Sequence, residues 1–297
     1  MGNLKGIVTK KVNGYYSVAF ENSEYLCKLK GLIKRENDKS NCITGDIVEF
    51  SKEELVITTV LPRKNSIMRP LVANIDYLLI TFSAKNPNFD FDRFSLILLN
   101  SFFYKITPVV VINKCDLLSD DEKTVFKERM NFLAKLEIPI FFVSTFNKSG
   151  INELELFLKE KISALAGPSG AGKSSLMNLL QDKVNAEVGD ISTKIERGKH
   201  TTKGATLIPM NCGGFIIDTP GFSNIDIPPV KSNAEYIELY PDISHLGSDC
   251  SFKDCVHINE PKCNVKLSLE NNSLSQERYD FYLKYYPNIT FSKKYKK

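Results

Sequence analysis

The chain has 297 residues, of which 42% are hydrophobic and 25% are charged, and its formal net charge is +4. This length suffices for two or three domains of an ordinary soluble protein, and the small charge excludes tight nucleic-acid binding by bulk electrostatics alone. No uncharged apolar run approaches the roughly 18 residues that span a bilayer, and the N-terminus lacks the apolar core of a signal peptide. We therefore expect a cytoplasmic protein without a membrane partner, whose seven cysteines form no disulfides.

The first sixty residues predict a small antiparallel β-barrel of the OB type. Short β-branched and aromatic runs alternate there with turn residues at positions 13–14 and 45–46. An OB barrel often binds single-stranded nucleic acid on one face. The alternative, which the sequence supports equally, is that the basic residues of the barrel form a solvated loop that binds no ligand. The basic side of the barrel would consist of Lys28, Lys30, Lys34 and Arg35.

A basic linker is predicted at residues 62–70, and beyond it apolar strands alternate with helices. Such alternation predicts a mostly parallel sheet covered on both faces, with its ligand at the carboxyl ends of the strands. The expected strands are residues 75–82, 108–112, 140–143, 164–166 and 215–217, and the expected helices are residues 91–104, 120–136 and 151–159.

Residues 113–116, Asn-Lys-Cys-Asp, follow the second of these strands and match the guanine-reading N-K-x-D of GTP-binding proteins. The Asp116 carboxylate can accept two hydrogen bonds from guanine N1 and N2, a donor pair that adenine lacks. Lys114 would lay its stem along the base, and Asn113 would tie this loop to the phosphate loop. Ser144 and Thr145, after the next strand, fall where such domains place a backbone amide on guanine O6.

Residues 167–174 fit the phosphate-binding pattern G-x-x-x-x-G-K-[ST] between an apolar strand and a helix. Lys173 would neutralise the β- and γ-phosphates, and the Ser174 hydroxyl would ligate Mg²⁺. A glycine-rich turn without a ligand is the weaker alternative. In an ordinary G-domain the guanine motif follows the phosphate loop, so the reversed order predicts a circularly permuted domain. The expected nucleotide contacts of this loop are Gly167, Pro168, Ser169, Gly170, Ala171, Gly172, Lys173, Ser174 and Ser175.

Asp-Thr-Pro-Gly at residues 218–221 follows the last apolar strand. Asp218 would hold Mg²⁺ through water, and the Gly221 amide would sense the γ-phosphate. Alone, the motif could be a simple turn. At this distance after a phosphate loop, the nucleotide interpretation is the stronger one.

The polar loop at residues 197–203 is expected to be the first switch, with a solvated basic loop as the alternative. A threonine hydroxyl, that of Thr202 in preference to Thr201, would complete the Mg²⁺ shell. Phe222 stands where many GTPases have a water-positioning Gln. Intrinsic hydrolysis should therefore be slow, with His200 or a partner positioning the water.

Cys250, Cys255, His257 and Cys263 lie within fourteen residues and offer three thiolates and one imidazole, enough for a closed tetrahedral Zn²⁺ site. Four protein ligands leave no open position, so we expect a structural ion, worth roughly 10 to 16 kcal/mol to a unit with a thin core. Unmetallated buried cysteines are the alternative. A helix at residues 274–286 and a lysine-rich tail complete the chain.

Together these residues resemble the RsgA (YjeQ/YloQ) family of bacterial ribosome-assembly GTPases. The matching motifs are residues 61–65, 69–70, 72–76, 167–175, 198–202, 218–222 and 252–263. The resemblance implies an OB-fold barrel (1–66), a circularly permuted GTPase domain (67–228) and a zinc-binding domain with a basic tail (229–297). It also implies a monomer that hydrolyses GTP to GDP and phosphate, stimulated by the small ribosomal subunit and its rRNA, in late maturation of that subunit.

Two rival functions stay open on the residues alone. One is an ATP-using P-loop enzyme, such as a small-molecule kinase, in which residues 113–116 are a coincidence. The other is an RNA-binding scaffold whose nucleotide site is regulatory or inert. Lys173, Ser174, Asp218 and a switch threonine argue against an inert site, and nucleotide preference separates the first rival.

Overall fold

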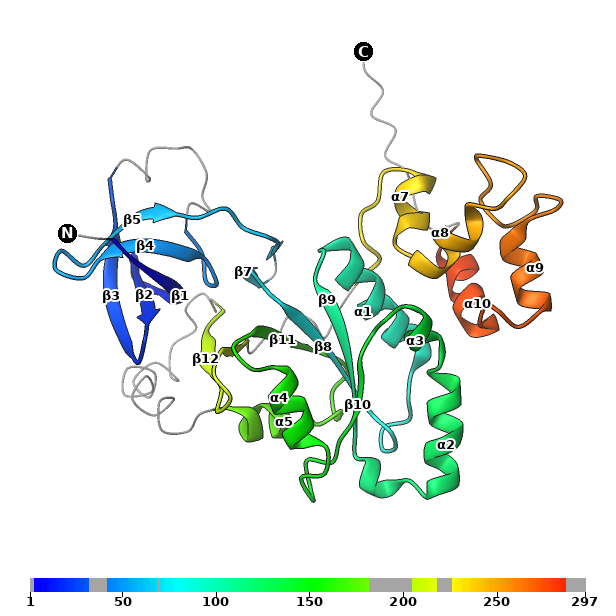
Figure 1. Cartoon of the computed structure of the whole chain (residues 1–297), viewed down its shortest axis with the longest axis horizontal. Helices are drawn as coiled ribbons and strands as arrows, with labels where there is room; N and C mark the ends of the chain where they lie inside the picture. Colours follow the sequence, from blue (N-terminus) through cyan, green and yellow to red (C-terminus); the bar gives the residue numbers. More distant parts are fainter. Residues whose placement is uncertain (1–2, 32–41, 69, 182–204, 218–225, 287–297) are drawn as a thin grey trace, which may run out of the picture.

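The computed structural model describes residues 3–31, 42–68, 70–181, 205–217 and 226–286, which form three units in a row (Figure 1). The first is a closed barrel, as predicted, with strand order β1-β2-β3-β5-β4. Its core includes Val18, Phe50 and Ile57, which are fully buried. Lys28 and Lys30 of the expected basic side are described, whereas Lys34 and Arg35 lie outside the described residues. The barrel strands are β1 (Leu4–Val12), β2 (Tyr15–Phe20), β3 (Ser23–Leu29), β4 (Ile47–Ser51) and β5 (Val56–Val60).

The central unit is a six-stranded sheet in the order β10-β9-β8-β11-β13-β12. Its neighbouring strands are parallel except for the edge strand β12, which runs antiparallel to β13. The mostly parallel sheet expected from the alternating pattern is thus confirmed. The strands are β8 (Tyr77–Ser83), β9 (Thr107–Asn113), β10 (Ile140–Phe142), β11 (Ile162–Ala166), β12 (Leu207–Pro209) and β13 (Phe215–Ile217).

Helices cover both faces of this sheet because successive strand residues point to opposite sides. In β9, Val110 and Ile112 join one buried cluster with α1, Met130 and α3, while Val109 and Val111 join another with α4 and α5. The helices are α1 (Phe91–Phe103), α2 (Asp120–Arg129), α3 (Phe132–Lys135), α4 (Ile151–Phe157) and α5 (Lys173–Leu180).

Two expectations for this region are wrong in detail. The predicted linker contains a strand, β6 (Ser66–Met68), which pairs with β7 (Leu71–Ala73). The single helix expected at residues 120–136 is two helices, because α2 buries none of its residues whereas Met130 and Leu133 are buried against the sheet. The chain must turn after Arg129 to bring those two side chains inward.

Buried polar contacts attach the barrel to the central unit. Asn74 Nδ2 donates to the Gly45 carbonyl at 2.9 Å, and the Ala73 amide donates to the Thr44 carbonyl at 2.9 Å. The Thr44 hydroxyl donates to the Ala205 carbonyl at 3.0 Å, a contact between segments 161 positions apart. The barrel is therefore attached at defined positions rather than tethered by a linker alone.

The C-terminal unit has more helix and a larger core than its weak apolar pattern predicts. Tyrosines account for the difference, since Tyr236, Tyr240 and Tyr282 are fully buried and contact one another. Leu99 of α1 belongs to the same buried cluster, so the central unit contributes to this core. The helices are α7 (Asn233–Glu238), α8 (Pro241–Gly247), α9 (Asn264–Glu270) and α10 (Gln276–Tyr285).

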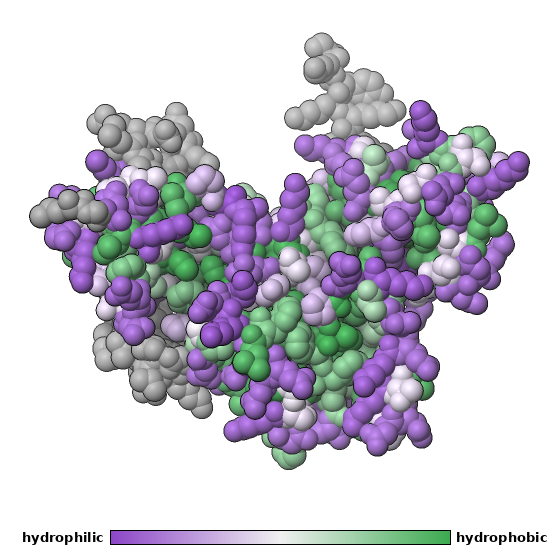
Figure 2. All heavy atoms as spheres, in the orientation of Figure 1, coloured by the Kyte–Doolittle hydropathy of each residue, from purple (hydrophilic) through white to green (hydrophobic). Residues whose placement is uncertain are grey.

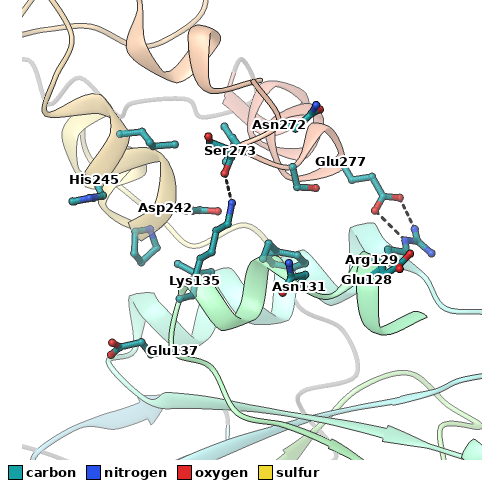
Figure 3. A pocket seen from close by; sticks show the side chains of 16 residues that line it. Glu128, Arg129, Asn131, Lys135, Glu137, Asp242, His245, Asn272, Ser273 and Glu277 are labelled. Carbon is teal, nitrogen blue, oxygen red and sulfur yellow. Dashed lines mark hydrogen bonds and ion pairs between the residues drawn. The ribbon is translucent and has the colours of Figure 1, made fainter. Parts of the chain in front are cut away.

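Polar contacts also join this unit to α2 and α3, around a pocket of about 550 Å³ (Figure 3). Arg129 pairs with Glu277 at 2.6 Å, and Lys135 Nζ donates to the Ser273 carbonyl at 2.7 Å. Hydrophilic side chains cover much of the visible surface of all three units (Figure 2). In the described ranges, every helix is too short or too polar to cross a membrane.

Candidate nucleotide site and metal centre

Three of the predicted motifs meet at one edge of the central sheet. Strand β9 ends at Asn113, Ser144 comes shortly after β10, and Gly167 follows β11 directly. Because these strands are parallel, their carboxyl ends lie at the same edge, where open α/β sheets bind their ligands. The loop predicted to read guanine and the predicted phosphate loop therefore lie at the same edge of the sheet.

Asn113 joins the segments of this site. Its side chain is fully buried, and Oδ1 accepts hydrogen bonds from the Lys114 amide at 2.8 Å and the Thr145 amide at 3.1 Å. Its Nδ2 donates to the Ala171 carbonyl at 3.0 Å. One amide side chain thus holds the end of β9, the loop after β10 and the phosphate loop in register.

Asp116 is exposed at the mouth of the site. Its Oδ1 accepts a hydrogen bond from the Ser144 hydroxyl at 2.5 Å, and that hydroxyl accepts bonds from the Phe146 and Asn147 amides at 3.2 and 3.3 Å. Lys114, at a φ of +61°, donates through Nζ to the Asn86 carbonyl. A carboxylate held in place from one side and open to solvent on the other can accept the two edge donors of guanine.

The phosphate loop admits only glycine at two of its positions. Gly167 has a φ of +141°, and a Cβ there would lie 2.0 Å from the Thr81 carbonyl oxygen. Gly172 has a φ of +86°, and its Cβ would lie 2.1 Å from Asn113 Nδ2. Side chains at these positions would force the loop away from β8 and β9. The glycines of the motif therefore serve close packing as well as backbone freedom.

The amino end of α5 faces the loop, as a phosphate site requires. Lys173 Nζ donates to the carbonyls of Gly167 and Pro168 at 2.8 and 2.7 Å, so the side chain folds back over the loop. Burial lowers the pKa of Lys173, and the charge of Arg93 adds to the effect. Negatively charged phosphate oxygens near the Lys173 ammonium would offset both of these effects on its pKa. Ser174 and Ser175 are exposed in the first turn of α5.

Several predicted site residues lie outside the described residues. They are His200, Thr202, Asp218, Gly221 and the neighbouring Phe222. Of the expected Mg²⁺ ligands, Ser174 is therefore the one whose position the structure describes.

The four predicted metal ligands converge in the C-terminal unit. The Sγ atoms of Cys250 and Cys263 lie 3.9 Å apart and lie 3.6 and 3.5 Å from His257 Nδ1, and all four ligand atoms, including that of Cys255, lie within 4.8 Å of one another. A tetrahedral zinc ion with ordinary bond lengths would separate two thiolates by about 3.8 Å and a thiolate from an imidazole nitrogen by about 3.6 Å. The geometry fits such an ion.

The chemistry of the cluster also favours a cation. Burial raises the pKa of Cys255 to about 12 and lowers the pKa of His257, so both groups are neutral near pH 7 when no ion is bound. A divalent cation would stabilise the thiolates and bind the neutral imidazole. The cluster can thus hold a metal ion.

Residues outside the predicted ligand set hold the ligand loop, and the sequence reasoning missed them. The Glu260 carboxylate accepts hydrogen bonds from the amides of Val256, Ile258 and Asn259 at 2.9 to 3.1 Å. Desolvation raises the pKa of Glu260, but these hydrogen bonds outweigh it and the net pKa lies below the ordinary value. The only sequence signal was a glutamate placed between two ligands.

Two tyrosines of α10 hold the same loop from the core. The Tyr279 hydroxyl donates to the His257 carbonyl at 2.6 Å, and the Tyr282 hydroxyl donates to the Val256 carbonyl at 2.8 Å. His257 itself has a φ of +63°, which a non-glycine residue rarely adopts. Side chains outside the predicted ligand set therefore hold the loop on both sides.

Comparison with known proteins identifies close relatives of the whole chain. The family model described as RsgA GTPase matches residues 60–228, and that of the RsgA N-terminal domain matches residues 5–57. A relative from Fusobacterium nucleatum, named small ribosomal subunit biogenesis GTPase RsgA, is 46% identical over 92% of this chain and 95% of its own length. One of the same name from Clostridium acetobutylicum is 37% identical, covering 99% of this chain and all of its own.

Two solved structures share the fold over almost the full length. YjeQ from Thermotoga maritima has a TM-score of 0.81 and 32% identity, covering 97% of this chain and 98% of its own. YloQ, described as a circularly permuted GTPase, has a TM-score of 0.79 and 28% identity, covering 97% of this chain and 95% of its own. The permuted order of the motifs is therefore shared with a solved structure.

Proposed function

The chain belongs to the RsgA GTPase family, and on this premise we propose that it hydrolyses GTP to GDP and phosphate when stimulated by the small ribosomal subunit, in late maturation of that subunit. The observation that carries the proposal is the position of Asn113. It bonds to the Ala171 carbonyl and to the Thr145 amide, so the guanine-reading and phosphate-binding loops are parts of one site.

In this proposal the base and the phosphates are bound by separate groups of residues. Asp116 accepts the guanine edge, Lys114 lies along the base, and Lys173 neutralises the β- and γ-phosphates. His200 helps to position the attacking water. The remaining nucleotide contacts are Asn113, Ser144, Thr145, Gly167, Pro168, Ser169, Gly170, Ala171, Gly172, Ser174, Ser175, Asp218 and Gly221, and the Mg²⁺ ligands are Ser174, Thr202 and Asp218.

We further propose that the ion held by Cys250, Cys255, His257 and Cys263 is zinc in a structural role. The donor set of three thiolates and one imidazole supports zinc over harder cations. The site supplies four protein ligands, which leaves no open position for a substrate. Its function is then to hold the C-terminal unit in shape.

The two flanking units are proposed to contact ribosomal RNA. The barrel is of a type that binds nucleic acid, and aromatic side chains accompany lysines on its surface: Lys28 lies over the Tyr15 ring and Lys52 over the Tyr25 ring. We propose a cytoplasmic monomer divided at 1–66, 67–228 and 229–297.

GTP turnover with and without purified small ribosomal subunits tests this function. We expect slow turnover alone and a stimulation by subunits of roughly 10³- to 10⁵-fold. Large subunits serve as the control and should not stimulate. An unchanged rate with small subunits would refute the ribosomal part and leave the GTP site standing.

An Asp116→Asn variant tests the guanine assignment. The amide cannot accept both edge donors of guanine but matches the additional oxygen of xanthine, so we expect GTP turnover to fall and xanthosine triphosphate turnover to rise. Retained GTP preference would remove Asp116 from the base site. Equal use of ATP by the unmodified protein would favour the P-loop kinase rival.

A further inference from the structure

The loop between β8 and α1, residues 84–90, lies against both parts of the predicted nucleotide site. Its Asn86 carbonyl accepts a hydrogen bond from Lys114 Nζ of the guanine motif. Its Pro87 ring lies beside the phosphate loop, since a Cβ built on Gly170 would be 3.3 Å from Pro87 Cδ. None of the motifs found in the sequence includes this loop. It is therefore a segment outside the predicted site that contacts both nucleotide-binding loops.

Ser83, the last residue of β8, holds this loop. Its side chain is 1% exposed, and its hydroxyl donates to the Pro87 carbonyl at 2.7 Å. The backbone around Ser83 is fixed as well, because Ser83 pairs with Asn113 in the parallel sheet and the Ala84 amide donates to the Asn113 carbonyl at 2.8 Å. The donor of the bond to Pro87 is thus part of the sheet that carries the predicted site.

The other end of the loop is anchored where α1 begins. Phe89 packs on the Phe82 ring, with centroids 5.1 Å apart, and the Asp90 side chain caps α1. Between the two anchors, Asn86 has a φ of +51°, which a non-glycine residue rarely adopts. The hydrogen bond from Ser83 to the residue after Asn86 therefore stabilises the conformation in which the Asn86 carbonyl meets its donor.

We infer that Ser83 is a positioning residue of the nucleotide site and acts through Lys114. The inference rests on the proposed function, in which the Lys114 stem lies along guanine. A lysine side chain loses rotamer freedom when a ligand fixes it, and this loss weakens binding. Ser83 holds the loop, and the Asn86 carbonyl of the loop holds the Lys114 ammonium. The stem is then already ordered when the nucleotide binds.

A local turn is the simpler explanation of a serine that bonds to a backbone carbonyl four residues away. Such a turn would need only the Ser83 bond, and its loop could lie anywhere on the surface. Here the same loop contacts Lys114 and Gly170, and its Lys85 forms an ion pair with Glu122 of α2 at 2.6 Å. These contacts connect the turn to the nucleotide site, so a purely local role explains less of the structure.

Calorimetric GDP affinities of three variants test this role. Ser83→Ala should weaken GDP binding about 2- to 12-fold, the contribution typical of one hydrogen bond, and Ser83→Thr, which keeps the hydroxyl, should bind more tightly than Ser83→Ala. Ser95→Ala is the matched control and should leave GDP affinity unchanged, because Ser95 is also fully buried but its hydroxyl has no hydrogen-bond partner among the residues that the structure describes. Normal GDP binding by Ser83→Ala would overturn the inference.

A double-mutant cycle separates a positioning role from a purely structural one. Lys114→Met keeps most of the stem but removes the ammonium. If Ser83 acts through that ammonium, the losses caused by Ser83→Ala and Lys114→Met should not multiply, and the double variant should bind GDP about as well as Lys114→Met alone. Losses that multiply would overturn the inference and leave the GTP site standing. Failure of the unmodified protein to bind GDP would instead refute the proposed function itself.

Discussion

The guanine loop (the two segments 113–116 and 144–147) and the metal loop (residues 250–263) are held in place by the same means but by different kinds of residue. In both, side-chain groups bind several backbone groups and fix an irregular segment. In the guanine loop, Asn113 and Ser144 both hold the backbone and belong to the proposed binding site. In the metal loop, Glu260 and Tyr279 hold the backbone and lie outside the predicted ligand set.

This difference predicts how the two sites respond to substitution. A change in the guanine loop should alter ligand binding and loop structure together, because one side chain serves both. At the metal site, a change in a ligand and a change in a residue that holds the loop should affect metal binding and loop structure to different extents. Four experiments test this contrast.

Loss of the metal should have the largest effect. Replacing Cys263 with Ser, or treating the protein with a strong chelator, should remove a contribution of roughly 10 kcal/mol to the folding of the C-terminal unit. Hydrogen exchange should become fast in α7 to α10, and elemental analysis should show loss of one ion per chain. GDP affinity should change little, and an equal loss of GDP binding would contradict the separation of the two sites.

Asn113→Ala should have the next largest effect, about 2 to 4 kcal/mol, since it leaves more than one buried backbone group without its partner. Both the thermal midpoint of the nucleotide-free protein and the affinity for GDP should fall. Asn22→Ala, at an exposed turn of the barrel, is the control. A variant with unaltered stability and lost GDP binding would show that the two roles of Asn113 can be separated after all.

Glu260→Ala should cost about 1 to 3 kcal/mol, because three amides lose an ionised acceptor but water can partly replace it. Metal affinity should weaken while the stoichiometry stays at one, and exchange at the three amides should accelerate. Glu260→Gln retains an acceptor oxygen and should show a smaller loss. If the Ala variant binds no metal at all, Glu260 is as necessary as a ligand and the contrast fails.

Tyr279→Phe should have the smallest effect, about 0.5 to 1.5 kcal/mol, since it removes one hydroxyl from the His257 carbonyl and leaves the ring in the core. Metal titration and thermal unfolding would measure it. Tyr285→Phe is a suitable control in the same helix. A loss as large as that of Cys263→Ser would mean that the hydroxyl decides the conformation of His257.

The sequence predicted those parts of the fold that depend on local pattern. Runs such as residues 108–112 indicated buried parallel strands, and the motif residues followed those strands directly. The break after Arg129 could not be predicted in this way, because it depends on the burial of Met130 and Leu133 against a sheet formed by distant segments.

The helices of the C-terminal unit escaped prediction for a related reason. Tyr236, Tyr240 and Tyr282 are intermediate in polarity, so their burial gives no clear apolar period, and Leu99 reaches their core from another part of the chain. The metal ligands were recognisable by spacing alone. Glu260 was not, because a carboxylate that binds three amides has no fixed sequence pattern.

Leu99 has a practical consequence for any attempt to divide this protein. Helix α1 lies in the central unit, yet its Leu99 side chain is fully buried with the tyrosines of the C-terminal unit, and Phe91, Leu96 and Phe103 pack beside it. A chain cut at residue 228 would place this apolar stripe in water and would tend to aggregate. The C-terminal unit thus shields the apolar side chains of α1 from water. A soluble GTPase fragment would have to retain that unit.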